Sequence, residues 1–516
     1  METVAENIPQ DVISLQELIV QLKNKNESLL QEVNYLSTKL EQLHFQLLNS
    51  LRRQYARKSE KLDGQLELQF DEATDENQEE VTQADEEITI AKHTRKKTGR
   101  RPLPEAFHRE QIIHDLLEEQ KICSCGHALH KMGEERSEQL EFIPARIKVL
   151  EHIRFKYACR LCAEGVKTAL LPPQAIPKSI STPGLLSHVL TSKFEDHLPL
   201  YRQEQIWQRL GIDIPRATLC NWVLKCGELF APLIKLLKAE IIESTYIHAD
   251  ETPVQVLKEE GKSATSKSYI WVYLTGPPAK PLVIYEYQPT RKGQVAYDFL
   301  EDFKGYLQTD AYPGYNALRK RDDINVFACW AHSRRKFVEI VKATKDNGKA
   351  QIALNFIRKL YEVESQVKAQ NFNELYKLRQ ERSKPILERF KIWLDEHVTR
   401  IPPKSPLGGA IAYTLSNWDA LNVYLTNGHL RIDNNHCENK IRPFALGRRN
   451  WLFMGNARGA NAATAILSLI ESAKANGLEA YYYLRYLLTK LPTCQTADQL
   501  KALLPHHCNS IEIMKI

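Results

Sequence analysis

Five β-rich segments, interrupted once by a helical stretch, constrain the fold of this 516-residue chain more than any other feature. In chain order they read TYIHADETPVQVL, SYIWVYL, PLVIYEY, GYLQTDAYPGY and INVFACW, and the helical stretch near 295–303 separates the third from the fourth. Parallel strands of one sheet need such a helical crossover. The pattern therefore predicts a multidomain α/β protein whose sheet is built from three successive strands, a helix and two more strands.

Two acids stand at the ends of apolar runs in this region. Asp250 follows the run 246–249, and Asp310 follows the run 306–309. The strand pattern has the outline of an RNase H-like fold with a mixed sheet. In that fold, carboxylates at the ends of neighbouring central strands converge on one edge, where Mg²⁺ is able to bridge them. The alternative for each aspartate alone is that it forms a turn after a strand. A metal site at this edge would also need a third acid.

The stretch LRIDNNHCENKIRPFALGRRNWLFMGNARG offers that third acid at Asp433 or Glu438. Its basic residues are Arg431, Lys440, Arg442, Arg448, Arg449 and Arg458. The net charge of the whole chain is only +6, so a nucleic-acid interpretation depends on local clusters such as this one. The cluster suits a metal-binding acid that lies against a polyanion. The alternative is an exposed helix in which Glu438 and Arg442 form a weak salt bridge.

A heptad repeat occupies residues 12–48, within a predicted zipper at 8–62. Its leucines are Leu15, Leu22, Leu29, Leu36 and Leu43. The other apolar position of each heptad holds mostly β-branched residues in the first heptads, with one polar exception at Asn26. This combination favours a parallel two-stranded coiled coil in which Asn26 fixes the register. The sequence predicts a homodimer; a single amphipathic helix packed on its own protein is the alternative.

A charged linker is predicted at 63–104. Residues 71–87 contain nine acids and no basic residue, which is typical of a solvated, disordered segment. A basic cluster ending in Arg100 and Arg101 then precedes Pro102. These arginines suit either a DNA minor groove or a flexible arm that binds phosphates without sequence preference. A simple solvated linker is the alternative.

Four of the ten cysteines form two close pairs in a region, 105–170, predicted to be a small zinc-binding β module. They are Cys123, Cys125, Cys159 and Cys162. The spacing of the second pair is typical of zinc ligands. The first pair is one residue closer than usual, which leaves His127 or His130 as a substitute for Cys123. Free cysteines in a small core are the alternative, and a disulfide framework is not expected.

The remaining segments are predicted to be largely helical. Within 175–240, a helix at 203–210, a turn at Gly211 and a helix beginning near 215–218 outline a helix-turn-helix. Its second helix would offer Thr218, Asn221 and Trp222 to a DNA groove; a purely structural helical hairpin is the alternative. A helical insertion near 335–428 interrupts a catalytic core at 241–470, and a helical region follows at 471–516. No leader or membrane-length apolar segment is recognised, so a soluble cytoplasmic protein is expected.

Several long motifs resemble the insertion sequence 66 family of transposases, a DDE-type group. They are HADETPVQVL, YLQTDAYPGYNAL, CWAHSRRKF and IDNNHCENKIRPFALGRRNWLFMG. The zipper, the GRRPLP arm, the cysteine module and SLIESAKANGLEAYYYLRYLL extend the resemblance over nearly the whole chain. It implies a catalytic triad of Asp250, Asp310 and Glu438 that binds Mg²⁺ or Mn²⁺ in a two-metal site. Asp433 then becomes a helix N-cap or a neighbour of the site.

The resemblance also implies roles for residues around this triad. Cys329 and His332 match a signature of the family, for which we expect a positioning or DNA-end role. The basic residues expected to hold DNA are Arg334, Arg335, Lys440, Arg442, Arg448 and Arg449, and structural Zn²⁺ is expected on the cysteines.

The function implied is cleavage and transfer of DNA strands at the terminal inverted repeats of the protein's own element and at target DNA. Accessory proteins encoded by the same element are expected partners, and the expected location is the bacterial cytoplasm, on the nucleoid when DNA is bound. Two other functions compete with this one. They are a catalytically silent DNA-binding protein derived from a transposase, and a structure-specific RNase H-like nuclease such as a junction resolvase.

Overall fold

The computed structural model describes residues 147–158, 166–344, 348–367 and 371–515, together with helical residues between 16 and 43. The chain divides into two compact units, one comprising residues 60–170 and the other the rest. Several predicted site residues lie outside the described residues: Leu15, Arg100, Arg101, Cys123, Cys125, Cys159 and Cys162. The described part of the smaller unit contains an antiparallel hairpin of strands β1 (Lys156–Ala158) and β2 (Val166–Thr168).

A mixed sheet forms the centre of the larger unit, as the sequence predicts. The five β-rich segments become β3 (Tyr246–Lys258), β4 (Lys267–Thr275), β5 (Val283–Gln288), β6 (Gly305–Gln308) and β7 (Ile324–Phe327). Their order in the sheet is β5-β4-β3-β6-β7. β3, β4 and β5 pair antiparallel, whereas β6 pairs parallel with both β3 and β7. Helix α5 (Gly293–Phe299) supplies the predicted crossover between β5 and β6.

The prediction that a strand ends at Asp250 is wrong. β3 continues for eight residues beyond it to Lys258, pairing with β4 and, near its end, with the short strand β8 (Met454–Asn456). The apolar run 246–249 is only the first part of β3, because burial on both faces continues to Glu251 and Thr252 around half-buried Asp250. Beyond Thr252, buried Val254 and Val256 alternate with exposed residues, which is the pattern of a half-buried strand rather than of a turn.

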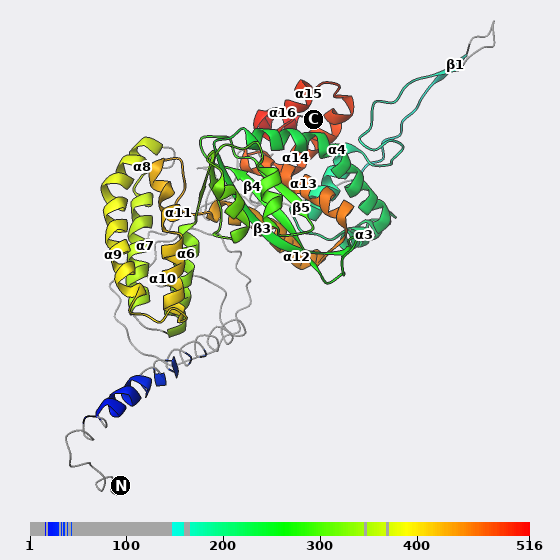
Figure 1. The fold of residues 1–516 in the computed structure, drawn as a ribbon. Helices are drawn as coiled ribbons and strands as arrows, with labels where there is room; N and C mark the ends of the chain where they lie inside the picture. The colour runs from blue at the N-terminus through cyan, green and yellow to red at the C-terminus, as the bar shows by residue number, and fades with distance from the viewer. Residues whose placement is uncertain are drawn as a thin grey trace, which may run out of the picture. The chain divides into compact units, whose positions relative to one another are not determined.

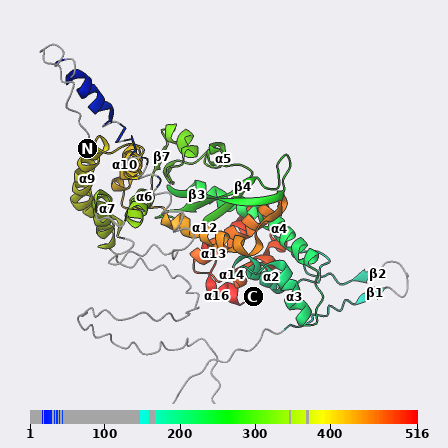
Figure 2. The ribbon, with the colours of Figure 1, turned by 90° about the horizontal axis from the view of Figure 1, so that it is seen from below.

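Helices cover both faces of the sheet, and alternation along β4 shows which residues face which layer. Tyr273 stacks on Phe299 of α5, with ring centroids 3.6 Å apart. On the opposite face, the Cys437 thiol of helix α12 (Asn435–Trp451) donates to the Val272 carbonyl at 3.9 Å. Figure 2 shows α5 on one side of β3 and β4, with α12 and α13 (Ala457–Ala475) on the other.

Helix α13 also protects the open edge of the sheet at β5. Its Ser468 and Ser472 hydroxyls accept hydrogen bonds from the backbone N–H groups of Tyr285 and Val283, at 2.9 and 2.8 Å. The Ser472 hydroxyl also donates to the Val283 carbonyl at 3.0 Å. An edge strand left unpaired would be a template for aggregation, so these two serines complete the sheet without another strand.

The predicted helical hairpin before the sheet is present. Helix α3 (Leu200–Arg209) leads through Gly211, whose φ of +78° suits glycine, into the 27-residue helix α4 (Arg216–Ile242). Further helices of the larger unit, outside the helical insertion, are α2 (Pro183–Phe194), α14 (Ala480–Lys490), η5 (Leu491–Thr493), α15 (Ala497–Lys501), η6 (Pro505–His507) and α16 (Ser510–Met514).

A helical bundle lies between β7 and α12 in the chain and beside the sheet in space (Figure 1). Its elements are α6 (Trp330–Thr344), α7 (Lys349–Ser365), α8 (Phe372–Leu378), η3 (Arg379–Ser383, a π-helical turn), α9 (Lys384–Val398), α10 (Pro406–Ser416), α11 (Trp418–Asn422) and η4 (Val423–Thr426). Trp330, Phe390 and Trp418 form its aromatic core, with ring centroids 6.0–6.2 Å apart. The sequence predicted this helical block, although its first helix begins five residues before 335.

The described residues of the predicted zipper are helical. Leu22, Asn26 and Leu29 lie in the continuous stretch 19–29, and Leu36 and Leu43 are also helical. About half of each leucine side chain is exposed, from 50% at Leu29 to 57% at Leu22, which leaves an apolar stripe open to a partner. Within the described residues, no helix combines the length and apolarity that crossing a membrane requires.

Candidate active site

The pairing register of β3 and β6 places Asp250 beside Asp310. The last residue pair of these parallel strands is His248 with Gln308. Asp250 and Asp310 each follow two residues later, and a two-residue step returns a side chain to the same face. The pKa of Asp250 is raised in part by the charge of Asp310, as this proximity requires.

Asp250 and its neighbour Glu251 face opposite layers. Asp250 pairs across the sheet with Val272, which faces away from its neighbour Tyr273 on the α5 side, so Asp250 lies on the α12 face. Glu251 lies on the α5 face, where Arg291 approaches its carboxylate at 2.6 Å and Tyr315 donates to it at 2.9 Å. Glu251 is therefore compensated within the fold, whereas Asp250 points toward the helix that carries Glu438.

Asn434 fixes the start of that helix onto the sheet. Its side-chain amide donates to the Ala249 carbonyl at 3.1 Å, and its Oδ1 lies 2.8 Å from Nδ1 of His248. Its backbone N–H donates to Sγ of Cys329 at 3.1 Å. One buried asparagine thus joins the residue before Asp250, the chain after β7 and the first turn of α12. Sequence reasoning missed Asn434, although an asparagine before a helix is a recognisable N-terminal signal.

Glu438 lies in the first turn of α12, where a carboxylate is favoured by the helix dipole. Its Oε2 accepts from Arg335 of α6 at 3.0 Å, and its Oε1 lies 3.8 Å from Nε2 of His332. Oε1 is buried and has no hydrogen-bond partner. Asp433, the other candidate, instead accepts from the Tyr361 hydroxyl and the Asn435 backbone at 2.9 and 3.2 Å. It is a neighbour of the helix start, while Asn434 occupies the N-cap position.

Burial and the neighbouring carboxylates disfavour the ionised form of Asp250 in the absence of a cation. The pKa of Asp250 is raised well above its usual range, first by burial and then by the charges of Glu251, Asp310 and Glu438. Asp250 accepts a hydrogen bond from the Glu251 backbone at 2.8 Å, and Asp310 accepts one from the Tyr312 backbone at 3.1 Å. Clustered carboxylate oxygens of this kind are the donor set that a hard divalent cation prefers.

Cys329, His332 and Glu438 form a second group whose ligand atoms lie within 4.8 Å of one another. The sequence analysis named all three residues but did not place Glu438 in one group with Cys329 and His332. Burial raises the pKa of the Cys329 thiol far above its usual range. Its sulfur accepts a hydrogen bond from the Asn434 backbone N–H, which joins Cys329 to the start of α12.

The predicted DNA-binding residues divide into two groups. Arg442 and Arg449 are exposed on α12, and Arg334 and Arg335 are half-buried on α6. Lys440, by contrast, lies 3.0 Å from Glu471 of α13, so its ammonium serves the fold. Arg448 donates to the Thr252 hydroxyl and the Pro253 carbonyl at the outer half of β3.

In the helical hairpin, only part of the predicted recognition surface is accessible. Asn221 is exposed and Thr218 is half-buried on α4. Trp222 is 3% exposed, so the prediction that it contacts a groove is wrong. On a 27-residue helix that packs along one side, position 222 lies in the apolar stripe with Leu219 and Cys226.

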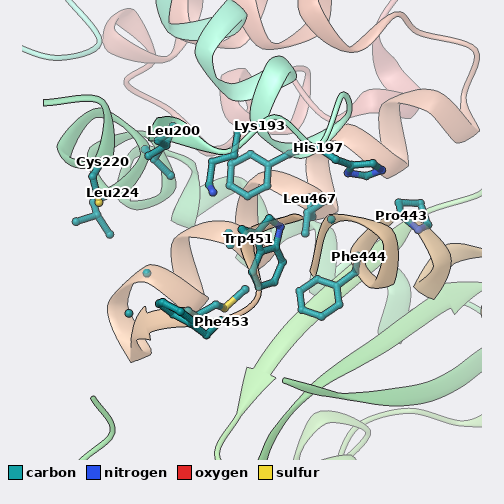
Figure 3. Close-up of a pocket in the computed structure, with 17 residues that line it drawn as sticks. Lys193, His197, Leu200, Cys220, Leu224, Pro443, Phe444, Trp451, Phe453 and Leu467 are labelled. Atoms are coloured by element: carbon teal, nitrogen blue, oxygen red, sulfur yellow. The ribbon is translucent and has the colours of Figure 1, made fainter. Parts of the chain in front are cut away.

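A mainly apolar cavity of about 150 Å³ lies between α2 and α4 on one side and α12 and α13 on the other. Figure 3 shows Trp451, Phe444 and Phe453 in this cavity, with Lys193 entering from α2. Burial lowers the pKa of Lys193 to about 8, because the ammonium loses water without gaining a carboxylate partner near enough to compensate.

This cavity gives a prediction for stability. Between pH 8 and about 10.4, the unfolded chain binds a proton at Lys193 that the folded chain does not, so folding stability rises with pH in that window. We expect Lys193→Met to be more stable than the natural protein at neutral pH and to lack this part of the rise. Urea unfolding of both proteins at about pH 8 and about pH 10 measures the difference. An equal pH dependence in both would contradict the pKa shift.

The family model for "Transposase IS66 family" matches residues 178–462, more than half of the chain. Models for the zinc-finger binding domain of transposase IS66, the IS66 C-terminal element and "Transposase C of IS166 homeodomain" match 120–163, 468–506 and 42–112. The four clustered cysteines fall within the first of these three ranges.

Two similar proteins of Sinorhizobium fredii extend these matches. The uncharacterized protein y4jD is 34% identical over 416 residues, which is 78% of this chain and 81% of that protein. The uncharacterized protein y4hP is 31% identical over 482 residues, 88% of this chain and 85% of that protein. The similarity therefore extends well beyond the sheet and its carboxylates.

Proposed function

The chain belongs to the IS66 family of transposases, and from this premise we propose that it binds the ends of its own insertion element and catalyses metal-dependent cleavage and transfer of DNA strands. The observation that carries the proposal is the convergence of Asp250, Asp310 and Glu438 on one face of the sheet. The strand order β5-β4-β3-β6-β7, antiparallel in its first half and parallel in its second, supports an RNase H-like core.

The three carboxylates are the proposed metal ligands. Mg²⁺ or Mn²⁺, when bound, supplies the Lewis acidity that activates water or a 3′-hydroxyl and stabilises the leaving oxygen at phosphorus. Asp250 and Asp310 are held by the rigid sheet, and Glu438 is held through Asn434 and Arg335. The unpartnered Oε1 of Glu438 supports this role, because a buried carboxylate oxygen without a partner is costly in a fold that does not use it.

The DNA backbone is proposed to lie along the exposed arginines of α12. Arg442 and Arg449 of this helix and Arg334 and Arg335 of α6 flank Glu438 in the chain or in space. The arm with Arg100 and Arg101, the α4 residues Thr218 and Asn221, and a Zn²⁺ module on the four cysteines would add contacts outside the core. Binding that depends on so many cationic contacts is expected to weaken steeply with salt.

Cys329 is proposed to act as a positioning residue for Glu438. We expect Cys329→Ala to reduce strand cleavage roughly 10–100-fold, the range seen when groups that orient metal ligands are removed, because the buried Asn434 N–H loses its acceptor. DNA binding should be unchanged. Cys329→Ser keeps an acceptor and should recover part of the activity, whereas equal loss in both variants together with loss of one bound metal would identify Cys329 as a ligand.

A homodimer through the zipper is the proposed assembly, and proteins encoded by the same element are proposed partners. The half-exposed leucines at 22, 29, 36 and 43 support this, since an apolar helical stripe is stable when a second helix covers it. Light scattering should give a dimer mass for the full chain and a lower stoichiometry after deletion of residues 1–50. An unchanged stoichiometry after deletion would contradict the zipper's role.

The proposed function is tested with the DNA that flanks the coding region. The full-length protein with Mg²⁺ or Mn²⁺ should nick duplexes that carry the element's terminal inverted repeats and should not cut matched duplexes with scrambled ends. Cutting of branched DNA irrespective of its ends would instead indicate a junction-resolving nuclease. Salt-sensitive binding without cleavage under either metal would indicate a catalytically silent DNA-binding protein.

A further inference from the structure

A glutamate and two histidines meet far from the proposed active site. Glu240 lies in the last turn of α4, and His506 and His507 form the end of the short helix η6. One ligand atom from each of the three residues lies within 4.8 Å of the others. The fold brings together residues more than 260 positions apart in the sequence, which is why the pattern is invisible in the sequence alone.

The two imidazoles contact different oxygens of one carboxylate. Nε2 of His506 lies 2.6 Å from Oε2 of Glu240, and Nε2 of His507 lies 3.7 Å from Oε1. The rings of the two histidines are 4.0 Å apart. Lys501 Nζ is 3.7 Å from Oε1 of Glu240, and Lys280 Nζ donates to the His506 backbone carbonyl at 2.8 Å. These lysines make the neighbourhood basic rather than acidic.

Two polar atoms of the cluster are buried without a hydrogen-bond partner. They are Oε1 of Glu240 and Nδ1 of His506. Hydrogen bonds within the described residues therefore leave one carboxylate oxygen and one ring nitrogen of this cluster without a partner.

We propose that Glu240, His506 and His507 bind a transition-metal ion such as Zn²⁺, with water completing the coordination. Two nitrogens and a carboxylate oxygen are a common zinc donor set. Zinc–ligand distances near 2.0–2.1 Å place tetrahedral ligands roughly 3.3 Å apart. The three ligand atoms, which lie within 4.8 Å of one another, would each have to shift by at most about 1.5 Å to reach this spacing. The proton that His506 shares with Glu240 would move to Nδ1 of the same ring.

Bound metal would fasten the C-terminal segment to the end of α4. η6 and α15 otherwise meet this helix through side chains such as Lys501, which is half exposed. The role is structural, and it depends neither on the carboxylates of the active site nor on the cysteine module. The inference therefore stands or fails independently of the proposed function.

The test measures metal per chain in the full-length protein purified with Zn²⁺. The double variant His506→Gln/His507→Gln should lose about one equivalent relative to the natural protein, while the control His397→Gln, in α9, should lose none. The single variant Glu240→Gln keeps the volume and a hydrogen-bonding group and should also lose the equivalent. Identical zinc content in the natural protein and both site variants would overturn the proposal.

Hydrogen exchange gives a local readout on the same proteins. Zn²⁺ at about ten times its Kd should slow exchange in residues 497–507 about tenfold in the natural protein, and a chelator should reverse the effect. Neither site variant should respond, and unchanged exchange in β3 and β4 would show that the variants are folded. Equal protection by Zn²⁺ in the natural protein and the variants would contradict a site at these residues.

Discussion

Asp310→Ala is expected to reduce DNA strand cleavage by roughly 10³-fold, comparable to the loss of a group that stabilises transition-state charge, while DNA binding persists. The strand register places Asp310 beside Asp250, and its Oδ1 accepts a local hydrogen bond from the Tyr312 backbone at 3.1 Å. The substitution removes a proposed metal ligand but leaves the arginines of α12 in place. Cleavage and binding of end DNA, measured on the same protein, separate the two effects.

The unfolding temperature of Asp310→Ala distinguishes the loss of a catalytic group from damage to the fold. The charge of Asp310 helps to raise the pKa of Asp250, so its removal relieves repulsion in the metal-free protein. Asp310→Ala should therefore unfold at the same or a higher temperature than the natural protein. Asp322→Ala makes the same chemical change at an exposed position and should leave cleavage unaltered. Normal cleavage by Asp310→Ala would remove Asp310 from the site.

Arg379→Met is expected to destabilise the helical insertion by about 3–5 kcal/mol, the cost of leaving a buried charge without its partner. Arg379 is 1% exposed. Its guanidinium binds both oxygens of Glu364, at 2.8 and 2.6 Å. It also donates to the backbone carbonyls of Tyr424, Asn427 and Leu430 at 2.8–2.9 Å. The substitution strands one carboxylate and three carbonyls in the core.

The same substitution should also impair catalysis. Residues 424–430 lead directly into the start of α12, so loosening them disturbs the position of Glu438. Urea unfolding measures the stability change, and Arg382→Met, an exposed position whose side chain bonds only to Gln366 at 2.7 Å among the contacts of the described residues, is the matched control. A loss below about 0.5 kcal/mol, the usual range for a surface substitution, would show that the contacts of Arg379 do not stabilise the helical insertion.

The parts of the fold that the sequence predicted are those with strong local signals. The strands follow apolar runs with β-branched and aromatic residues, and the α3–α4 turn follows Gly211. Local signals were misleading where one strand has two environments: β3 is buried on both faces as far as Thr252, apart from half-buried Asp250, and on one face beyond it. The interpretation of Trp222 failed because the composition of a helix does not show which stripe faces the core.

The proposed ligands of the candidate site could be named from the sequence, whereas the residues that hold them in place could not. Strand ends and a family motif were sufficient to propose Asp250, Asp310 and Glu438. The contacts of Asn434 with Ala249 and Cys329, however, join segments 105 to 185 residues apart. No local pattern encodes such contacts. The ion pair between Lys440 and Glu471 could not be predicted for the same reason. The sequence of a basic cluster does not show whether a given lysine faces DNA or a neighbouring helix.

The central claim, that three carboxylates share one metal site, can be tested by replacing Mg²⁺ with Fe²⁺. With hydrogen peroxide as the oxidant and ascorbate to regenerate Fe²⁺, the bound ion reduces peroxide to hydroxyl radicals that cut the polypeptide backbone nearby. We expect cuts near Asp250, Asp310 and Glu438, all suppressed by excess Mg²⁺ and all lost together in Asp310→Ala. Cuts near Cys329, His332 and Glu438 without cuts near Asp250 and Asp310 would contradict it.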